Sequence, residues 1–196
     1  MLKIVIAPNP ILFHIAKPVF RVDAPVIKTV EEMKKTLLET DDPKGVGLAA
    51  PQVGKPLRIF LAKPTDNSKI LVFINPKITA NEKQLTTNSK KLEVRSQKLE
   101  VSNQKSKGSK KLEGCLSLPN IWGPVLRTQS LTLAFLDEKG NKHTKIFNGF
   151  MATIIQHEMD HLEGILFPKR VLEQKGTLYK SHKNKKGEDE FEEIEI

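Results

Sequence analysis

Apolar residues recur with a helical period in two parts of the chain, and each part predicts a helix. The first helix begins near Pro25 and ends at Asp41-Asp42-Pro43. Its apolar residues lie three or four positions apart, and charged residues take the opposite face. The apolar face consists of Val26, Val30, Met33 and Leu37, and the charged face consists of Glu31, Glu32, Lys34 and Lys35.

The second helical pattern begins near Phe150, and Gly164 is expected to cap its end. Its apolar residues again fall at helical spacing, which predicts a helix that packs into the core. They are Phe150, Met151, Ile154, Ile155 and Leu162.

Short apolar or alternating runs between turn residues predict strands. They cover residues 4–7, 57–62, 70–74, 131–135 and 144–147. We expect Asn75-Pro76 to close the third of these, and residues 119–124, which contain two prolines and a glycine, to form a turn. One or two helical turns are expected within residues 11–16.

The second helix carries Gln156-His157-Glu158-Met159-Asp160-His161. A helix turns about 100° per residue, so His157 and His161 lie one turn apart on the same face. Two imidazoles at this spacing can bind one metal ion, with Glu158 beside the metal to move protons. The alternative is a helix whose histidines are exposed, or hydrogen-bonded in the core, without a metal.

A metal site needs a third protein ligand, which this helix does not supply. One large class of peptidases continues the motif to H-E-x-x-H-x-x-G-x-x-H, whose last histidine is the third ligand. Gly164 fits that pattern, but the last position here is Phe167, which cannot bind a metal. The third ligand must therefore lie elsewhere in the chain.

Cys115 is the only cysteine, so no disulfide can form within the chain, which suits a reducing compartment. It lies in the segment Glu113-Gly114-Cys115-Leu116-Ser117, among residues that bend the backbone. A lone cysteine is usually a small buried hydrophobe. The other interpretation is that its thiolate is the missing third ligand for His157 and His161.

The composition of the 196-residue chain, 38% hydrophobic and 28% charged, is typical of one soluble globular domain. The N-terminus lacks the apolar length of a signal peptide. No apolar run approaches the roughly 20 residues that a membrane helix needs. We therefore expect a cytoplasmic protein with no membrane partner.

The formal net charge is +9, and much of the excess lies in residues 81–112, which contain nine basic and three acidic residues and no aromatic ones. Such polar segments rarely bury enough surface to become ordered. We interpret this segment as a flexible basic insertion in a single domain over residues 1–175. A β-hairpin built from its Lys-Leu-Glu-Val runs is the alternative. Residues 176–196 are interpreted as a polar, disordered tail.

Residues 45–54 are rich in glycine and alanine. Gly45 and Gly47 allow another backbone to approach closely. The segment is not a phosphate loop, because the Gly-Lys-Ser/Thr ending is absent. Taken alone, an ordinary loop leading into the strand at residues 57–62 is favoured.

Three segments in this order closely resemble the peptide deformylase family: G-x-G-L-A-A-x-Q at residues 45–52, E-G-C-L-S at residues 113–117, and Q-H-E-x-D-H at residues 156–161. The resemblance extends over roughly residues 3–175 and excludes the insertion and the tail. It implies an α+β fold in which mixed or antiparallel strands pack around the central metal-binding helix.

The resemblance also implies roles for individual residues. Cys115, His157 and His161 match the metal ligands, and Glu158 matches the catalytic acid/base. Gln52 and the backbone N–H of Leu116 match the pair that polarises the formyl oxygen. The cofactor implied is one divalent ion per chain, Fe²⁺ in most members, with Zn²⁺, Ni²⁺ or Co²⁺ as alternatives.

The reaction implied is removal of formate from the N-formylmethionine of newly synthesised polypeptides. Gly45, Val46 and Gly47 match the edge that pairs with the substrate backbone, and we expect Val46, Phe150 and Ile154 to line the methionine pocket. We expect a monomer that contacts the ribosome transiently. Trp122 departs from the family, because many members carry there an arginine that helps to hold the substrate backbone.

Two other interpretations remain open at this point. A general H-E-x-x-H metallopeptidase is the first, although such enzymes usually take a histidine or glutamate as third ligand. A basic RNA- or ribosome-binding protein on a retired enzyme scaffold is the second. The intact set of Gln52, Cys115, His157, Glu158 and His161 favours the deformylase.

Overall fold

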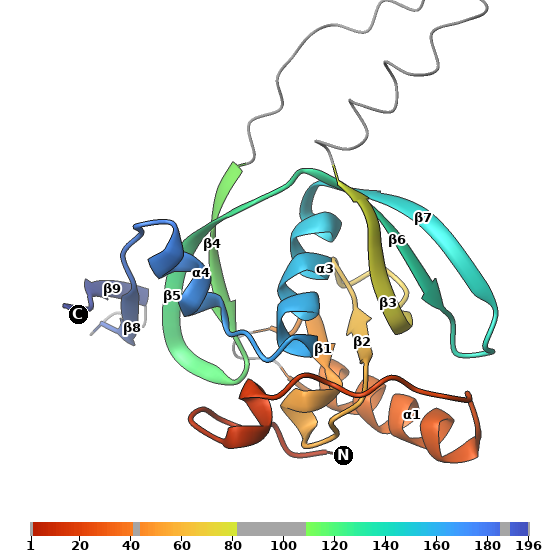
Figure 1. Ribbon diagram of the computed structural model, residues 1–196. Helices are drawn as coiled ribbons and strands as arrows, with labels where there is room; N and C mark the ends of the chain where they lie inside the picture. Colours follow the sequence, from red (N-terminus) through yellow and green to blue (C-terminus); the bar gives the residue numbers. More distant parts are fainter. Residues whose placement is uncertain (1, 41–43, 82–108, 185–188, 196) are drawn as a thin grey trace, which may run out of the picture.

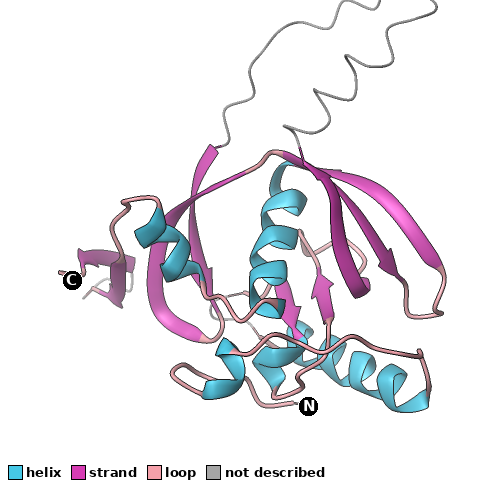
Figure 2. Ribbon diagram, in the orientation of Figure 1, coloured by secondary structure: helices cyan, strands magenta, loops and turns pink. Residues whose placement is uncertain are grey.

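Helix α3 (Gly149–Leu162) lies between two antiparallel sheets (Figure 1). The computed structural model describes residues 2–40, 44–81, 109–184 and 189–195. Figure 2 distinguishes its helices, strands and loops. The arrangement confirms the expected α+β fold, with strands packed around one central helix.

The larger sheet has five strands in the order β1-β2-β3-β6-β7, all antiparallel. The strands are β1 (Gly47–Ala49), β2 (Ile59–Ala62), β3 (Leu71–Asn81), β6 (Ser130–Leu136) and β7 (Lys142–Asn148). The predicted hairpin of residues 131–135 and 144–147 is confirmed as β6 and β7.

The smaller sheet has four antiparallel strands in the order β4-β5-β8-β9. They are β4 (Ser109–Cys115), β5 (Leu118–Arg127), β8 (Tyr179–Lys183) and β9 (Asp189–Glu193). The remaining elements are the 3₁₀ helices η1 (Pro10–Phe13) and η2 (Ala50–Val53) and the helices α1 (Ala24–Leu38) and α4 (Phe167–Glu173).

Strand β2 is buried along its whole length because α3 packs on one of its faces and α1 on the other. Phe60 belongs to the cluster that packs against α3, and its ring stacks on Phe73 with 4.6 Å between centroids. Ile59 and Leu61 belong to the cluster under α1. Successive residues of a strand face opposite sides, so burial on both sides selects a continuous apolar run.

Helix α1 confirms the first predicted helix. Val30, Met33 and Leu37 are buried in the cluster under it, and Val26 packs against that cluster. The Asp23 side chain accepts a hydrogen bond of 3.2 Å from the Val26 N–H, so it caps the first turn. The apolar stripe therefore faces the sheet, as its spacing predicts.

Two predictions about strands are wrong. Residues 4–7 form no strand; the Val5 N–H instead donates to the Gln52 carbonyl over 2.8 Å. Asn75 does not end β3, which continues to Asn81 past a change of register. The Asn75 backbone has φ +50°, and its side chain bonds the backbone of Val19, which stabilises the irregular position.

Residues 119–124 form no turn, because they lie within β5. Strand β8 pairs with β5 at Ile121 and Trp122, so among the described residues no strand pairs with that side of β5 at Pro124. Proline is tolerated at such edges. The turn precedes β5, at Leu116 and Ser117.

The proposed limits of the basic insertion are also wrong at both ends. Asn81 belongs to β3, and residues 109–112 belong to β4. Residues 82–108, which contain both Lys-Leu-Glu-Val runs, lie outside the described part of the chain. The prediction of flexibility for that segment stays a prediction.

The prediction of a disordered tail is wrong for Tyr179–Lys183 and Asp189–Glu193, which form β8 and β9. A basic strand pairs here with an acidic one. The Lys183 Nζ lies 2.8 Å from the Asp189 Oδ1, and the His182 Nε2 lies 3.4 Å from the Glu190 Oε2. Opposite charges on facing strands stabilise a hairpin that apolar periodicity does not reveal.

Gly164 ends α3 with φ +69°, as expected for a C-cap. A Cβ there would lie 2.6 Å from the Phe13 carbonyl group. We expect Gly164→Ala to lower the free energy of unfolding by about 2–3 kcal/mol. Gly149 is the matched control, because it has φ +60° but nothing within 4 Å. Gly149→Ala should cost about 1 kcal/mol. If urea denaturation gives equal losses for the two variants, the clash of the added Cβ with Phe13 does not contribute to the loss.

Candidate metal centre and active site

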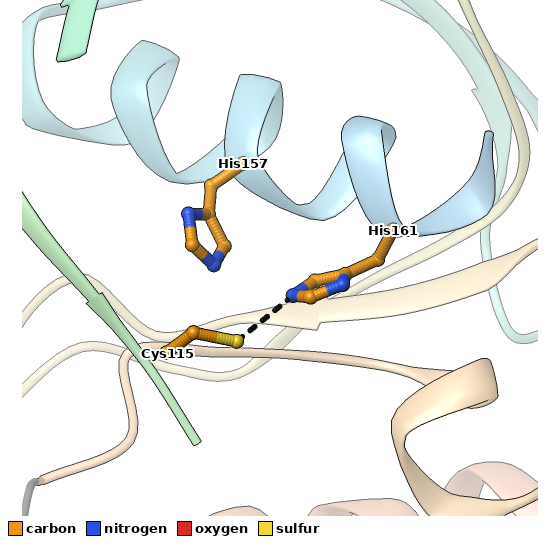
Figure 3. Close-up of side chains that lie close together, drawn as sticks. All are labelled: Cys115, His157 and His161. Atoms are coloured by element: carbon orange, nitrogen blue, oxygen red, sulfur yellow. Dashed lines mark hydrogen bonds between the residues drawn. The ribbon is translucent and has the colours of Figure 1, made fainter. Parts of the chain in front are cut away.

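Helix α3 carries His157 and His161 one turn apart, with ring centroids separated by 5.0 Å. Figure 3 shows both imidazoles pointing from the helix toward Cys115, the last residue of β4. The Cys115 Sγ lies 3.2 Å from the His161 Nε2. One donor atom from each of the three residues lies within 4.8 Å of the others.

The chemistry of these three side chains fits one metal ion. A thiolate and two imidazoles are ligands that suit Zn²⁺ and Fe²⁺, and three protein ligands leave room for a further one. Burial and the nearby His157 lower the pKa of His161, which favours the neutral imidazole that binds metals. Cys115, His157 and His161 therefore form a metal-binding group for a single ion.

Glu113 orients His157 from the side opposite the ligand atom. The His157 Nδ1–H donates to Glu113 Oε2 over 2.9 Å, so Nε2 is free to bind a metal. Arg127 donates to both oxygens of Glu113, over 2.8 and 2.9 Å. Burial opposes ionisation of Glu113, but the hydrogen bonds from Arg127 and His157 outweigh it and lower its pKa to about 2.

The same arginine continues the network into α3 and α4. Arg127 donates to Asp160 Oδ2 over 2.7 Å, and Arg170 of α4 donates to Asp160 Oδ1 over 2.7 Å. Glu113, Arg127 and Asp160 are all buried. The network therefore joins β4, β5, α3 and α4 directly behind the histidines.

Glu158 lies on α3 between the two histidines and is only 3% exposed. Its Oε2 has no hydrogen-bond partner among the described residues. Burial raises the pKa of Glu158 to about 7. A carboxyl group with such a pKa can both accept and donate a proton near neutral pH.

Gly47 of β1 lies directly against this carboxylate. A Cβ at position 47 would fall 2.2 Å from Glu158 Oε1. Only glycine therefore leaves the carboxylate where it is. The sequence predicted that another backbone approaches Gly47, whereas the neighbour that requires glycine in the structure is a side chain of α3.

Gln52 is 2% exposed and its amide is held at both ends. Its Oε1 accepts a hydrogen bond of 2.8 Å from the Ala49 N–H. Its Nε2 lies 3.4 Å from Cys115 Sγ and 3.3 Å from Ser117 Oγ. The donor end of the amide therefore faces the metal-binding group.

One pocket contains almost all of the residues predicted for the site. It is lined by Gly45, Val46, Gly47, Gln52, Cys115, Leu116, Phe150, Ile154, His157 and Glu158. His161 lies behind it, in contact with Cys115. The pocket brings together segments from β1, η2, β4 and α3 that are far apart in the sequence.

A family model described as Polypeptide deformylase matches residues 1–176. The chain belongs to this family. A peptide deformylase of Rhodopirellula baltica is 36% identical over 177 residues, which are 88% of this chain and 74% of that protein. The peptide deformylase of Mesorhizobium japonicum is 37% identical over 84% of this chain and 80% of its own length.

Solved peptide deformylases share the fold. The enzyme from Synechococcus elongatus in complex with actinonin has a TM-score of 0.70 at 31% identity, over 86% of this chain and 78% of that one. The Thermotoga maritima enzyme has a TM-score of 0.67 at 30% identity, over 87% of this chain and 97% of its own. This deformylase therefore removes the N-formyl group from nascent polypeptides, as its family does.

Sequence patterns did not reveal several parts of this deformylase site. Arg127 and Asp160 form the network behind the ligands, and Lys111 and Gly114 line the pocket. Glu113 and Asp160 lie inside two of the family motifs, and this position indicates that they belong to the site. Arg127 lies in no family motif, so the sequence offered no signal for this arginine within a strand.

None of the described helices is long and apolar enough to cross a membrane.

Proposed function

We propose that this deformylase hydrolyses N-formylmethionyl peptides with Cys115, His157 and His161 as ligands of one Fe²⁺ ion. Zn²⁺, Ni²⁺ and Co²⁺ are the alternative ions. The observation that carries the proposal is that the three donor atoms meet beside the buried Glu158 carboxylate. A divalent ion bound there would supply positive charge that polarises the formyl group and lowers the pKa of a water molecule.

The chain's own residues account for the proton transfers. Glu158 accepts a proton from the attacking water as the water oxygen adds to the formyl carbon. Glu158 then gives that proton to the amine nitrogen as the C–N bond breaks. Formate and the free N-terminus of the peptide are the products. The raised pKa of Glu158, about 7, supports both the acceptance and the return of the proton.

Gln52 and Leu116 stabilise the charge that develops on the formyl oxygen. The Gln52 Nε2 and the Leu116 backbone N–H are the proposed donors. The hydrogen bond from Ala49 to Gln52 Oε1 supports this role, because it holds the amide with its donor end toward the site. A donor fixed before the reaction stabilises the oxyanion without reorganisation.

The rest of the pocket would bind the peptide. Val46, Phe150 and Ile154 would surround the methionine side chain, and Gly45 and Gly47 would leave room for the substrate backbone. All of these residues line the pocket that contains Glu158. Main-chain hydrogen bonds along residues 45–47 would hold the peptide as an added strand.

The test is formate release from formyl-Met-Ala-Ser by protein purified without oxygen, with its metal content measured. Rapid release by Fe²⁺-loaded protein is expected. Acetyl-Met-Ala-Ser should not be cleaved, because the site is proposed to act on the small formyl group. No release by protein that contains the metal would contradict the proposal.

Gln52→Glu keeps the oxygen that Ala49 needs and replaces the donor with an acceptor. We expect kcat to fall by about 10²–10³-fold, the usual effect of losing one oxyanion donor. Ser117→Ala is the control, because it removes a neighbour of Gln52 but keeps the Gln52 donor. If both variants retain wild-type kcat at equal metal content, Gln52 does not stabilise the oxyanion.

We further propose that the protein acts in the cytoplasm as a monomer and contacts the ribosome transiently. Its single cysteine fits a reducing compartment. The basic residues of the segment 81–112 are the expected contact with ribosomal RNA. Residues 82–108 of this segment lie outside the described part of the chain, and the net positive charge of the segment supports the contact.

A further inference from the structure

Trp122 of β5 forms part of the pocket wall opposite α3. Its ring lies directly on the backbone of Gly114, its partner residue in β4. A Cβ at Gly114 would fall 2.8 Å from the indole ring. Gly114 lies between Glu113, which orients His157, and the ligand Cys115. The indole therefore packs against the strand that ends at Cys115.

The C-terminal hairpin of β8 and β9 holds this indole on its outer side. The Trp122 Nε1–H donates to Ser181 Oγ of β8 over 3.0 Å. The ring of Phe191 in β9 meets the indole edge-on, with 6.1 Å between centroids and 83° between planes. In Figure 1 the two strands lie on the outer side of β5, away from α3.

The hairpin is also attached to the core of the smaller sheet. Leu178 is buried in the cluster that contains Cys115, and Ile194 packs against the same cluster. The Ile194 N–H donates to the Leu178 carbonyl over 2.8 Å. The hairpin is therefore anchored at its base, next to the strand pair that it supports.

All of these supporting residues follow the part of the chain that matches the family model, which ends at residue 176. The match includes Trp122 but not Ser181, Phe191 or Ile194. The pocket wall thus depends on a segment that the family alignment does not cover. An unsupported indole would have several rotamers available, and fixing one of them before binding removes an entropic cost.

We propose that the β8–β9 hairpin is a positioning element for the substrate pocket. Ser181 and Phe191 are positioning residues that fix the Trp122 indole as a flat apolar wall for the peptide that follows the methionine. This inference rests on the proposed function, because the peptide is its ligand. Loss of the support should weaken peptide binding and leave the chemical step intact, since Glu158 and Gln52 lie on other elements.

The experiment compares full-length Ser181→Ala and Phe191→Ala with the wild type, using formyl-Met-Ala-Ser. We expect KM to rise by about three- to tenfold, with kcat within twofold. Ser181→Thr keeps the hydroxyl and should restore KM. His182→Ala is the matched control, because His182 neighbours Ser181 but pairs with Glu190 on the exposed face. Thermal melting of every variant checks that the fold is retained.

Trp122 is the only tryptophan, so its fluorescence reports on this wall alone. Emission should shift to longer wavelength in Ser181→Ala and Phe191→Ala, and remain unchanged in His182→Ala. An unchanged KM in both support variants would overturn the inference, whether or not the emission shifts. A fall in kcat with constant KM would also overturn it. A wild-type protein that releases no formate would instead overturn the proposed function, and with it the peptide as the ligand of this wall.

Discussion

Glu158→Gln is expected to lower kcat for formyl-Met-Ala-Ser by roughly 10²–10⁴-fold, the usual contribution of general acid–base catalysis. Glutamine has nearly the same shape, so the close packing against Gly47 should be kept. It cannot accept a proton from water or return one to the amine. Steady-state formate release at saturating peptide measures the effect.

Two comparisons show whether such a loss arises from Glu158 itself. Metal content and melting temperature should match those of the wild type, because Glu158 is not one of the three ligands. Glu163→Gln is the matched control, since Glu163 lies just past the end of the same helix and pairs at the surface with Arg58. It should keep activity within twofold. A Glu158→Gln enzyme within tenfold of the wild type would exclude the acid–base role.

Arg127→Met is expected to lower the free energy of unfolding by about 3–5 kcal/mol, the usual cost of removing one partner from a buried ion pair. The arginine is 7% exposed and bonds two buried carboxylates. Without it, the partners left among the described residues are His157 for Glu113 and Arg170 for Asp160. Methionine fills much of the volume, so the loss reports on charge more than on packing.

Arg170→Met is the matched control, because Arg170 binds the same Asp160. Its side chain is 31% exposed, so water compensates for its loss. We expect a cost of about 1 kcal/mol or less. Urea denaturation of both variants measures the difference. Equal costs would mean that Arg127 is not the centre of the network.

The elements with strong local signals were predictable from the sequence. Helix α1 has an N-cap residue, an apolar face and a sequence that ends the helix. The β6–β7 hairpin has alternating apolar and polar residues on both sides of a turn. The β8–β9 hairpin had neither signal, because its strands pair through opposite charges. Proline and glycine in β5 indicated a turn, and only the partial pairing with β8 explains why a strand tolerates them there.

The residues of the candidate site likewise divide into those that local sequence predicts and those that depend on contacts between distant elements. The two histidines and Glu158 follow from helical spacing alone, whereas Cys115 had two open interpretations until the family resemblance favoured its role as a ligand. Arg127 could not be found, because its partners come from two other elements and are distant in the sequence. The importance of Gly47 was visible as a need for close approach, but Glu158 as its neighbour depends on how α3 lies on β1.

The ligands of the metal-binding group come from the two sides of the molecule. Cys115 ends a strand of the smaller sheet, and the histidines lie on the helix that packs against the larger one. No short segment contains the whole donor set, so the set is complete only after both halves have folded and met. An ion that binds all three residues shifts the folding equilibrium toward the native state by mass action. We therefore expect this enzyme to take up its ion late in folding, because a partly folded chain lacks the complete donor set.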